Sequence, residues 1–477
     1  MTEKAVTYRK AEPWRNTLWP MVNGANNLYV MLMVFVSYVA AGGYGIAVAT
    51  AGMIATSSRI CDAVTDPICA LISDKLPAKY GRVRILMAVG YTIMALSVLF
   101  IFHWGVGGNI VTYTLGYLVY ILGYTLFNIA QNMGNPIIST EPQQRMNVGR
   151  WRSIYTQVAA VAVTWYMSNI LGPKYGGLKM GAFQEMCNMC VIAGAILTVI
   201  SMIAISPYDK AENFAGTRNS KVGIKDCFEV LKHNKAIWAF IAAASSDKLA
   251  LQAASQSAIT TMVFGIIIGN YKFNGNLSMI TLIPTILIMF YATKLRGKGD
   301  TKSTLIKWTW ISIGLGAVMV AFMTIGDPTK ISVSPVYTIA FLVLYCMFTG
   351  AKIVTSACNG VMIPDVVDYE MYISGNYMPA TVSAVYTFVD KLVSSLATTI
   401  VGFCVAAVGY VTVMPQPGDP CTTPIFWMAM FLWMGLPILG WLCTQAAMHF
   451  YPLDREMMKT VQAANYEARA AMAENRK

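Results

Sequence analysis

The sequence predicts an all-α polytopic membrane protein, with twelve transmembrane helices in two six-helix halves. The chain has 477 residues and is 56% hydrophobic but only 12% charged, with a mean hydropathy of +0.53. A soluble protein carries roughly twice that charged fraction. Apolar runs long enough to cross a bilayer recur from Trp19 to Tyr451, which excludes a soluble multi-domain protein. No cleavable signal peptide is predicted, because the first apolar run is long enough to remain a span.

The apolar runs define the expected spans when each crossing needs at least about 19 residues. They lie at residues 17–41, 44–73, 84–105, 110–138, 152–172, 184–206, 236–268, 275–293, 307–326, 336–362, 379–413 and 424–451. The expected organisation is an N-terminal half (1–206), a cytoplasmic central loop (207–235), a C-terminal half (236–451) and a cytoplasmic tail (452–477).

The net charge of +12 follows topology rather than a polyanionic partner. Only four of the 35 Lys and Arg residues fall on the side opposite the termini, namely Lys174, Lys179, Lys272 and Lys330. Four more lie within spans: Arg59, Lys248, Lys352 and Lys391. The positive-inside rule therefore puts both termini in the cytoplasm, with the basic loops near anionic headgroups and no role in binding nucleic acid.

The N-terminal tail is predicted to be a solvated cytoplasmic arm because it is basic, with Lys4, Arg9, Lys10 and Arg15. The first span then carries three amides, Asn23, Asn26 and Asn27. Amides are costly against lipid, so some should face the interior of the protein. The structural alternative is that they form hydrogen bonds between helices.

The second span contains two carboxylates, Asp62 and Asp66, four residues apart and therefore on one helical face. Pro67 follows and cannot donate to the carbonyl of Ala63, so that oxygen is left free beside the acids. Two close carboxylates resist joint ionisation, and a bound cation or a shared proton relieves the conflict. The pair therefore predicts a site for Na⁺, Li⁺ or H⁺. The alternative is a structural pair that is satisfied by Arg59 or by a neighbouring helix.

A basic loop follows the second span, with Asp74 at the helix end and Gly81 and Arg82 beyond it. A similar loop, KLRGK at residues 294–298, follows the eighth span. This recurrence indicates two related halves, and we expect Asp74, Gly81 and Arg82 to act as a gating loop.

The fourth span is unusually polar. Four of its polar residues recur at i, i+4, i+7 and i+11, on one helical face: Tyr124, Asn128, Gln131 and Asn135. Amides and a phenol suit a hydroxyl-binding surface. At the start of the fifth span, Arg152 is the arginine best placed to turn inward.

The second half contains its own intramembrane charges: Asp247, Lys248, Lys352, Asp390 and Lys391. Each is a functional candidate at membrane depth, or is held structurally by a partner of opposite charge. No metal site is predicted, because the three histidines are far apart and the C-x-x-C of Cys187 and Cys190 lacks accompanying ligands. No nucleophile–base set is visible either, so the chain is not expected to be an enzyme and needs no cofactor beyond a coupling ion.

The chain resembles the glycoside–pentoside–hexuronide:cation symporters, the relatives of melibiose permease within the major facilitator superfamily. The matching elements are RICDAVTDP (59–67), KYGR (79–82), PDVVDYE (364–370), DK (390–391) and YPLDR (451–455). They follow the family order over nearly the whole chain. The first and third elements are specific, whereas the Gly-Arg loop alone is weak.

The resemblance implies the roles of individual residues. Asp62 and Asp66 would hold the coupling cation with help from Thr65 and Thr125. The positions that would shape the sugar site are Asn26, Tyr124, Asn128, Asn132, Arg152, Tyr386 and Lys391, the last lying near both sites. The fold implied is the twelve-helix major facilitator fold, and the activity is import of a sugar or sugar acid together with Na⁺ or H⁺.

One departure from the family pattern concerns substrate. Galactoside-type members carry Asp at the positions of Asn26 and Asn128, and an aromatic residue at that of Asn132. Carboxylates accept hydrogen bonds from sugar hydroxyls but repel a substrate carboxylate, whereas amides do not repel it. With Lys391 and Arg152 present, we expect a glucuronide or hexuronate. Glucuronide-transporting relatives look similar at these amides.

Several alternatives remain open. A neutral pentoside or β-glucoside is the nearest alternative substrate. A lipid or amphiphile transporter would need an apolar cavity, against which the fourth-span amides argue, and a transport-dead sensor would bind sugar without accumulating it. The expected location is the cytoplasmic (inner) membrane, with a monomer as the functional unit.

Overall fold

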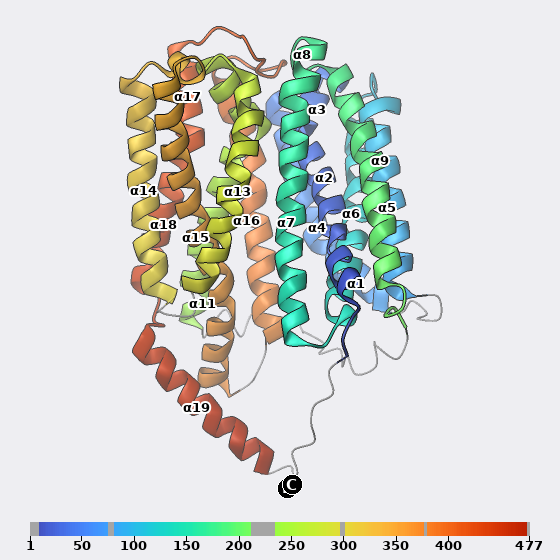
Figure 1. The fold of residues 1–477 in the computed structure, drawn as a ribbon, viewed down its shortest axis with the longest axis vertical. Helices are drawn as coiled ribbons and strands as arrows, with labels where there is room; N and C mark the ends of the chain where they lie inside the picture. The colour runs from blue at the N-terminus through green and yellow to red at the C-terminus, as the bar shows by residue number, and fades with distance from the viewer. Residues whose placement is uncertain (1–8, 75–80, 211–233, 296–300, 376–378, 475–477) are drawn as a thin grey trace. The chain divides into compact units, whose positions relative to one another are not determined.

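The computed structural model describes residues 9–74, 81–210, 234–295, 301–375 and 379–474 (Figure 1). Within these ranges some helical side chains, including those of Asp66 and Asp74, lie outside the described part. The regular structure of the described residues is helical throughout. The chain forms two compact units. Unit 1 comprises Met1–Arg218, Asn270–Leu282 and Gly402–Asp419; unit 2 comprises Asn219–Gly269, Ile283–Val401 and Pro420–Lys477.

The helices that begin before residue 210 all belong to unit 1 (Figure 1). They are α1 (Pro13–Leu18), α2 (Met21–Met33), α3 (Val36–Tyr44), α4 (Val48–Asp74), α5 (Arg82–Leu99), α6 (Ile110–Ile138), α7 (Pro142–Tyr166), α8 (Gly172–Tyr175) and α9 (Met180–Ile205). Two of them continue into π-helical turns, α5 into Phe100–Trp104 and α7 into Met167–Leu171.

The remaining helices build most of unit 2. They are α11 (Lys235–Ala254), α12 (Ser257–Thr260), α13 (Tyr271–Leu295), α14 (Thr301–Ile325), α15 (Pro335–Ser374), α16 (Pro379–Ala407), α17 (Thr423–Met430), α18 (Leu436–Phe450) and α19 (Arg455–Glu474). π-Helical turns extend α12 through Thr261–Ile267 and join α17 to α18 through Phe431–Gly435.

Each of the twelve expected spans corresponds to one straight or bent helical segment. The agreement is closest for α6, whose bounds equal the expected 110–138. Elsewhere helices extend beyond the apolar run: α7 begins at Pro142 and α15 reaches Ser374. Polar residues continue a helix into water without ending it. Conversely, α16 stops at Ala407 rather than 413, because Gly409 adopts a φ of 106° that breaks the helix.

Eight helices in the described part are long and apolar enough to cross a membrane, and ten are if each of two bent pairs counts as one span. The bends are 44° between α2 and α3 and 52° between α11 and α12, and neither was expected from the sequence. The two other expected spans are α4 and α7, whose hydropathy is lowered by residues such as Arg59, Asp62, Arg150 and Arg152.

The helix pair α5 and α6 packs at very short range through two glycines. A Cβ on Gly90 would lie 2.7 Å from Phe127 N, and a Cβ on Gly123 would lie 2.6 Å from Met94 N. Only residues without side chains allow two helix backbones to approach so closely. This contact fixes the position of α6, which carries Thr125, Asn128 and the other polar residues of the fourth expected span.

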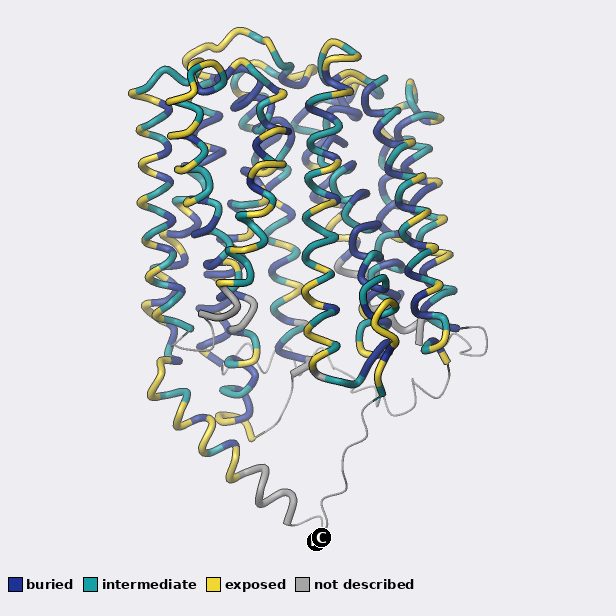
Figure 2. Tube along the Cα trace, in the orientation of Figure 1, coloured by how far each residue is buried: buried dark blue, intermediate teal, exposed yellow. Residues whose placement is uncertain are grey.

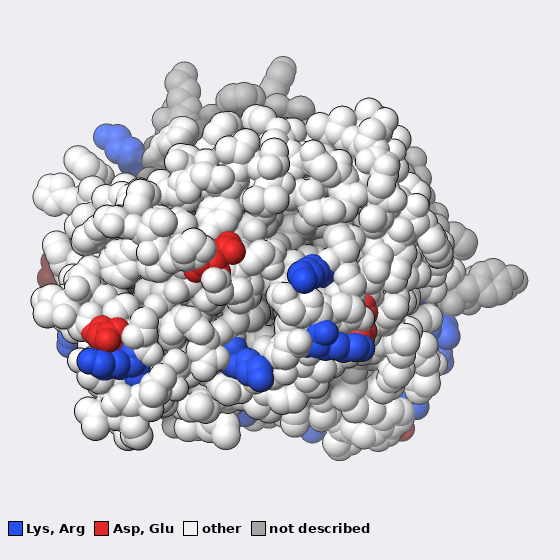
Figure 3. All heavy atoms as spheres, turned by 90° about the horizontal axis from the view of Figure 1, so that it is seen from above, with Lys and Arg blue, Asp and Glu red and all other residues white. Residues whose placement is uncertain are grey.

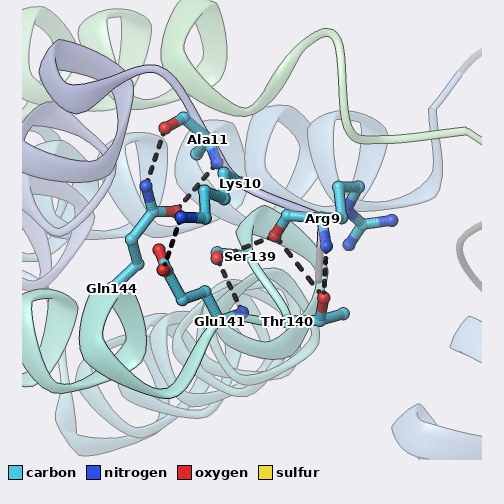
Figure 4. Close-up of polar contacts among 7 residues, drawn as sticks. All are labelled: Arg9, Lys10, Ala11, Ser139, Thr140, Glu141 and Gln144. Atoms are coloured by element: carbon cyan, nitrogen blue, oxygen red, sulfur yellow. Dashed lines mark hydrogen bonds and ion pairs between the residues drawn. The ribbon is translucent and has the colours of Figure 1, made fainter. Parts of the chain in front are cut away.

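Residues 9–15 are docked on the protein rather than forming a free arm, which corrects the sequence-based expectation, although Lys10 and residues 12–14 remain exposed. Lys4 lies outside the described residues. Figure 4 shows Arg9 N donating to Thr140 Oγ1 (2.8 Å) and Ser139 Oγ donating to Arg9 O (3.1 Å). The Gln144 side chain accepts from Ala11 N (2.8 Å) and donates to Ala11 O (2.9 Å). We call residues 9–12 the N-terminal strap, which pairs with the connection between α6 and α7.

Charged groups reinforce the strap. Lys10 Nζ lies 2.9 Å from a carboxylate oxygen of Glu141, and Arg15 Nη1 donates to Ile203 O over 2.9 Å. The basic residues were expected to stay in water, but the carbonyls and the carboxylate left exposed at helix ends offer them acceptors. Composition alone does not reveal these acceptors.

The C-terminal helix α19 packs along the end of α15 within unit 2 (Figure 1). Asn465 Nδ2 donates to Asp368 O over 2.8 Å, and the side chain of Val461 is completely buried. The outer face of α19 is exposed, as Figure 2 shows. The tail is therefore an amphipathic helix with a fixed position.

In the view from above (Figure 3), charged side chains are few and most of the surface shown is uncharged.

Candidate functional site

Asp62 and Thr125 lie together in the interior of unit 1, on α4 and α6. Both are only 2% exposed, and Thr125 Oγ1 donates to Asp62 Oδ1 over 2.7 Å. Thr65 Oγ1 donates to the backbone carbonyl of Asp62 over 3.2 Å. The structure thus brings together three of the four residues expected at the cation site. The fourth, Asp66, is in α4, but its side chain lies outside the described residues.

A positive charge also lies near this acid. The Arg59 guanidinium, one helical turn before Asp62, interacts electrostatically with this acid and with the phenol of Tyr117. Tyr117 belongs to a row of aromatic rings along α6, in which Tyr120 and Tyr124 stack at 6.1 Å between centroids. Arg59 therefore competes with any bound cation for the negative charge of Asp62.

Asn26 and Asn128 meet across α2 and α6. Asn26 Nδ2 donates to Asn128 Oδ1 over 3.1 Å, and Asn128 Nδ2 donates to Tyr124 O over 3.0 Å. Among the described residues, the buried Asn26 Oδ1 has no hydrogen-bond partner. A buried amide oxygen without a donor is unfavourable, so this atom is available to accept from a ligand hydroxyl.

Other amides of the polar stripe on α6 hold the helix to the first span. Gln131 Nε2 donates to Asn23 Oδ1, and Asn135 Oδ1 accepts from Trp19 Nε1 over 3.0 Å. On α2, Asn27 Nδ2 donates to the Thr156 carbonyl of α7 over 2.8 Å. These contacts match the structural alternative, so only Tyr124, Asn128 and Asn132 of this span remain candidates for ligand contact.

Asn132 on α6 and Arg152 on α7 are exposed. Among the described side chains, neither has a hydrogen bond or ion pair to Asn26 or Asn128. The structure thus assembles the amide pair but places no direct contact between it and these two residues.

In unit 2, Asp247 is held on both oxygens. Trp441 Nε1 donates to Asp247 Oδ1 (2.7 Å) and Asn359 Nδ2 donates to Asp247 Oδ2 (3.2 Å), while Lys352 supplies positive charge nearby. The Lys352 ammonium also lies 5.3 Å from the centroid of the Phe348 ring. This arrangement settles the orientation that the sequence left open: Asp247 faces the core of unit 2 and joins α11 to α15 and α18.

Tyr386 and Lys391 both lie on α16. The Tyr386 ring packs against Phe240, with 4.8 Å between centroids, and Lys391 is half-buried. Beside them, Asp390 forms an ion pair with Lys248 of α11. The sequence marked Asp390 and Lys248 as intramembrane charges but gave no signal that they pair, because they are 142 positions apart.

At the expected gating loop, Gly81 precedes α5 with a φ of 88°, and Arg82 is half-buried. The side chain of Asp74 lies outside the described residues. A buried acid that sequence analysis missed, Asp209, accepts from Val83 N (3.1 Å) and Arg84 N (2.9 Å) and pairs with the Arg84 side chain. Asp209 caps the N-terminus of α5, where a carboxylate is stabilised by the free backbone N–H groups and the helix dipole. The sequence did not indicate this role, because Asp209 lies beyond the apolar run of α9 and belongs to no recognisable motif.

Residues 22–455 match the family described as MFS/sugar transport protein. YagG of Escherichia coli (strain K12), which is provisionally named a glycoside/cation symporter, is 21% identical over 93% of this chain and 92% of its own length. The glucuronide carrier protein homolog of the same organism is 24% identical, over 33% of this chain and 34% of its own.

Among solved structures, a mutant of the nucleoside transporter NupG superposes with a TM-score of 0.63. It is 13% identical, and the match covers 91% of this chain and 99% of that one. At this identity the likeness shows the fold alone.

Proposed function

Because the chain belongs to the MFS/sugar transport protein family, we propose that it is a cation-coupled symporter that imports a glycoside, with a glucuronide or another hexuronide as the substrate. The family consists of transporters, so the expectations of a multi-pass membrane protein with the major facilitator fold, and of a protein that is not an enzyme, are confirmed. The names of two relatives, a glycoside/cation symporter and a glucuronide carrier homolog, support the coupling and the substrate class.

The observation that carries the coupling is the buried contact between Asp62 and Thr125. A carboxylate and a hydroxyl in contact inside a span supply hard oxygen ligands for a cation. At membrane depth both groups are costly unless they have hydrogen-bond partners or a bound ion. We assign the coupling ion, Na⁺ or H⁺, to Asp62, Asp66, Thr65 and Thr125. Binding of the ion offsets the charge of the acids, and the ion and the sugar each raise the other's affinity.

The substrate assignment is supported by the amide pair of Asn26 and Asn128. The unpartnered Asn26 Oδ1 can accept from a sugar hydroxyl without placing a formal charge next to a substrate carboxylate. Tyr124, Asn132, Arg152, Tyr386 and Lys391 complete the proposed set. A neutral glycoside remains the second candidate, because a relative that matches 93% of this chain is named for a glycoside.

We further propose that the chain is a monomer in the inner membrane with both termini in the cytoplasm. Only four of the 35 Lys and Arg residues fall in the expected loops on the side opposite the termini, and this scarcity supports the orientation by the positive-inside rule.

The test is substrate-dependent flux of H⁺ or Na⁺ into proteoliposomes that contain the full-length chain. A nitrophenyl β-glucuronide and the matching glucoside serve as substrates. We expect flux with the glucuronide, and loss of concentrative uptake in Asp62→Asn and Asp66→Asn. Asp327→Asn, at an exposed loop ion pair, is the matched control and should behave as wild type. If both acid variants still accumulate sugar at the expense of the ion gradient, the coupling assignment is wrong.

A further inference from the structure

The ion pair between Lys248 and Asp390 is incomplete in a way that points to a ligand. Asp390 is 3% exposed and its Oδ2 binds the Lys248 ammonium. Its Oδ1 is buried and has no hydrogen-bond partner among the described residues. The Lys248 side chain, in contrast, is 50% exposed. One end of the pair is thus buried and lacks a donor, while the other end remains accessible.

The neighbouring acid shows what a satisfied structural carboxylate looks like in this unit. Asp247 receives a hydrogen bond on each oxygen, from Trp441 and from Asn359. A buried carboxylate oxygen without a hydrogen-bond donor is costly. An ion pair retained only for stability would therefore be expected to have a donor on each carboxylate oxygen, as Asp247 has. Asp390 Oδ1 lacks such a donor in the described part of the chain.

The exposed side of the pair is polar rather than lipid-like. Lys248 and Gln252 of α11 and its C-cap residue Ser255 recur at i, i+4 and i+7, and all three are exposed. On α16 the exposed apolar residues Phe388 and Leu392 lie on the side of the helix opposite Asp390. An exposed polar stripe at membrane depth faces a water-filled space, where a solute can reach it.

The chemistry of the pair suits a hydroxyl. The ammonium of Lys248 donates and Asp390 Oδ1 accepts, and a hydroxyl, or two adjacent hydroxyls, can fill both roles. A substrate carboxylate suits the pair poorly, because Asp390 would repel it. We propose that Lys248 and Asp390 are a substrate-binding pair of unit 2 that holds ring hydroxyls of the transported sugar. This inference rests on the proposed function and adds Lys248 and Asp390 of unit 2 to the proposed substrate-binding residues.

The test measures equilibrium binding to the purified full-length chain in lipid nanodiscs. The probes are nitrophenyl β-glucuronide, nitrophenyl β-glucoside and the monodeoxy derivatives of the glucuronide. The variants are Lys248→Gln, Asp390→Asn, their double variant, and the reversed pair Lys248→Asp with Asp390→Lys. The exposed pair changed to Lys330→Gln with Asp327→Asn is the control, and it should bind every probe as wild type does.

We expect each single variant to weaken binding of the parent sugars about tenfold or more, and the double variant to be no better. At least one monodeoxy glucuronide should bind wild type and the Asp390→Asn variant equally, because it lacks the hydroxyl that Asp390 holds. The reversed pair keeps the ion pair, so it should fold with an unchanged unfolding temperature but bind weakly.

Recovery of wild-type affinity in the double variant or in the reversed pair would show a purely structural role and overturn the proposal. Equal weakening for every monodeoxy sugar would overturn it as well. If wild type binds sugars while all the pair variants match it, this inference fails and the proposed function stands. If wild type binds none of the probes, both fail.

Discussion

Thr125 Oγ1 donates a 2.7 Å hydrogen bond to Asp62 Oδ1, and both side chains are almost completely buried. The contact joins α6 to α4 at the place where the ion is proposed to bind. A hydroxyl can serve a carboxylate as a donor when the site is empty and turn its oxygen toward a metal ion when the site is filled.

Replacing Thr125 by Val should therefore weaken binding of the ion more than binding of the sugar. We expect about a tenfold higher ion concentration for half-maximal uptake in Thr125→Val, because the ion loses an oxygen ligand and Asp62 loses a donor. Thr125→Ser keeps the hydroxyl and should stay near wild type. Uptake measured against Na⁺ and against pH checks this, and an unchanged ion dependence in the Val variant would speak against the site.

The amide at position 26 should set the preference between charged and neutral sugars. In Asn26→Asp, the ratio of glucuronide to glucoside uptake should fall about tenfold or more, because a carboxylate now faces the substrate carboxylate. Competition between the two nitrophenyl sugars measures the ratio. Asn109→Asp makes the same change in charge at the N-cap of α6, where either residue can accept from Thr112 N, and should leave the ratio unaltered.

Trp441 should be essential for the stability of unit 2. Trp441→Phe removes the donor to Asp247 Oδ1 but keeps an aromatic ring, so we expect a loss of about 1–3 kcal/mol in unfolding free energy. Trp427→Phe is the matched control, because Trp427 is exposed and has no such role. Thermal unfolding in detergent compares them; equal midpoints in the two variants would contradict the assignment.

The glycine contact between α5 and α6 should tolerate no side chain. Gly123→Ala would place a Cβ 2.6 Å from Met94 N, a backbone atom that cannot move aside without shifting a helix. We expect destabilisation of about 1–3 kcal/mol. Gly149→Ala, where a Cβ meets nothing within 4 Å, is the control and should be neutral or slightly stabilising. The yield of monodisperse protein and its unfolding temperature report the difference.

The N-terminal strap should contribute to the stability of unit 1 through Gln144. Gln144→Ala removes both hydrogen bonds to Ala11 and should cost about 1–3 kcal/mol. The neighbouring Gln143 is exposed, so Gln143→Ala should have little effect. Limited proteolysis followed by mass spectrometry offers a direct reading, since cleavage near Arg9 should accelerate only in the Gln144 variant.

The spans were predictable because a bilayer imposes a simple requirement of length and apolarity, which α6 meets from Ile110 to Ile138. Helix ends were less predictable. Nothing in hydropathy says that Pro142 starts a helix before the membrane begins, or that the first span bends after Met33. The bend depends on packing, which local sequence does not contain.

The contact between Asp62 and Thr125 agrees with the family pattern, and its two residues are 63 positions apart. Polar contacts outside that pattern could not be predicted. The sequence suggested separate charges for Lys248 and Asp390, a ligand contact for Gln131 and a solvated cation for Arg9. Only the folded chain shows which distant partner each of these residues contacts.

The fixed position of α19 has a practical consequence for anyone who attaches a reporter to this protein. Val461 and Asn465 cover the end of α15. A fluorescent protein fused before these residues, in place of the rest of α19, would expose apolar surface and promote aggregation of the solubilised transporter. Joining the reporter after residue 474 keeps that cover in place and lets its brightness follow the amount of correctly assembled transporter.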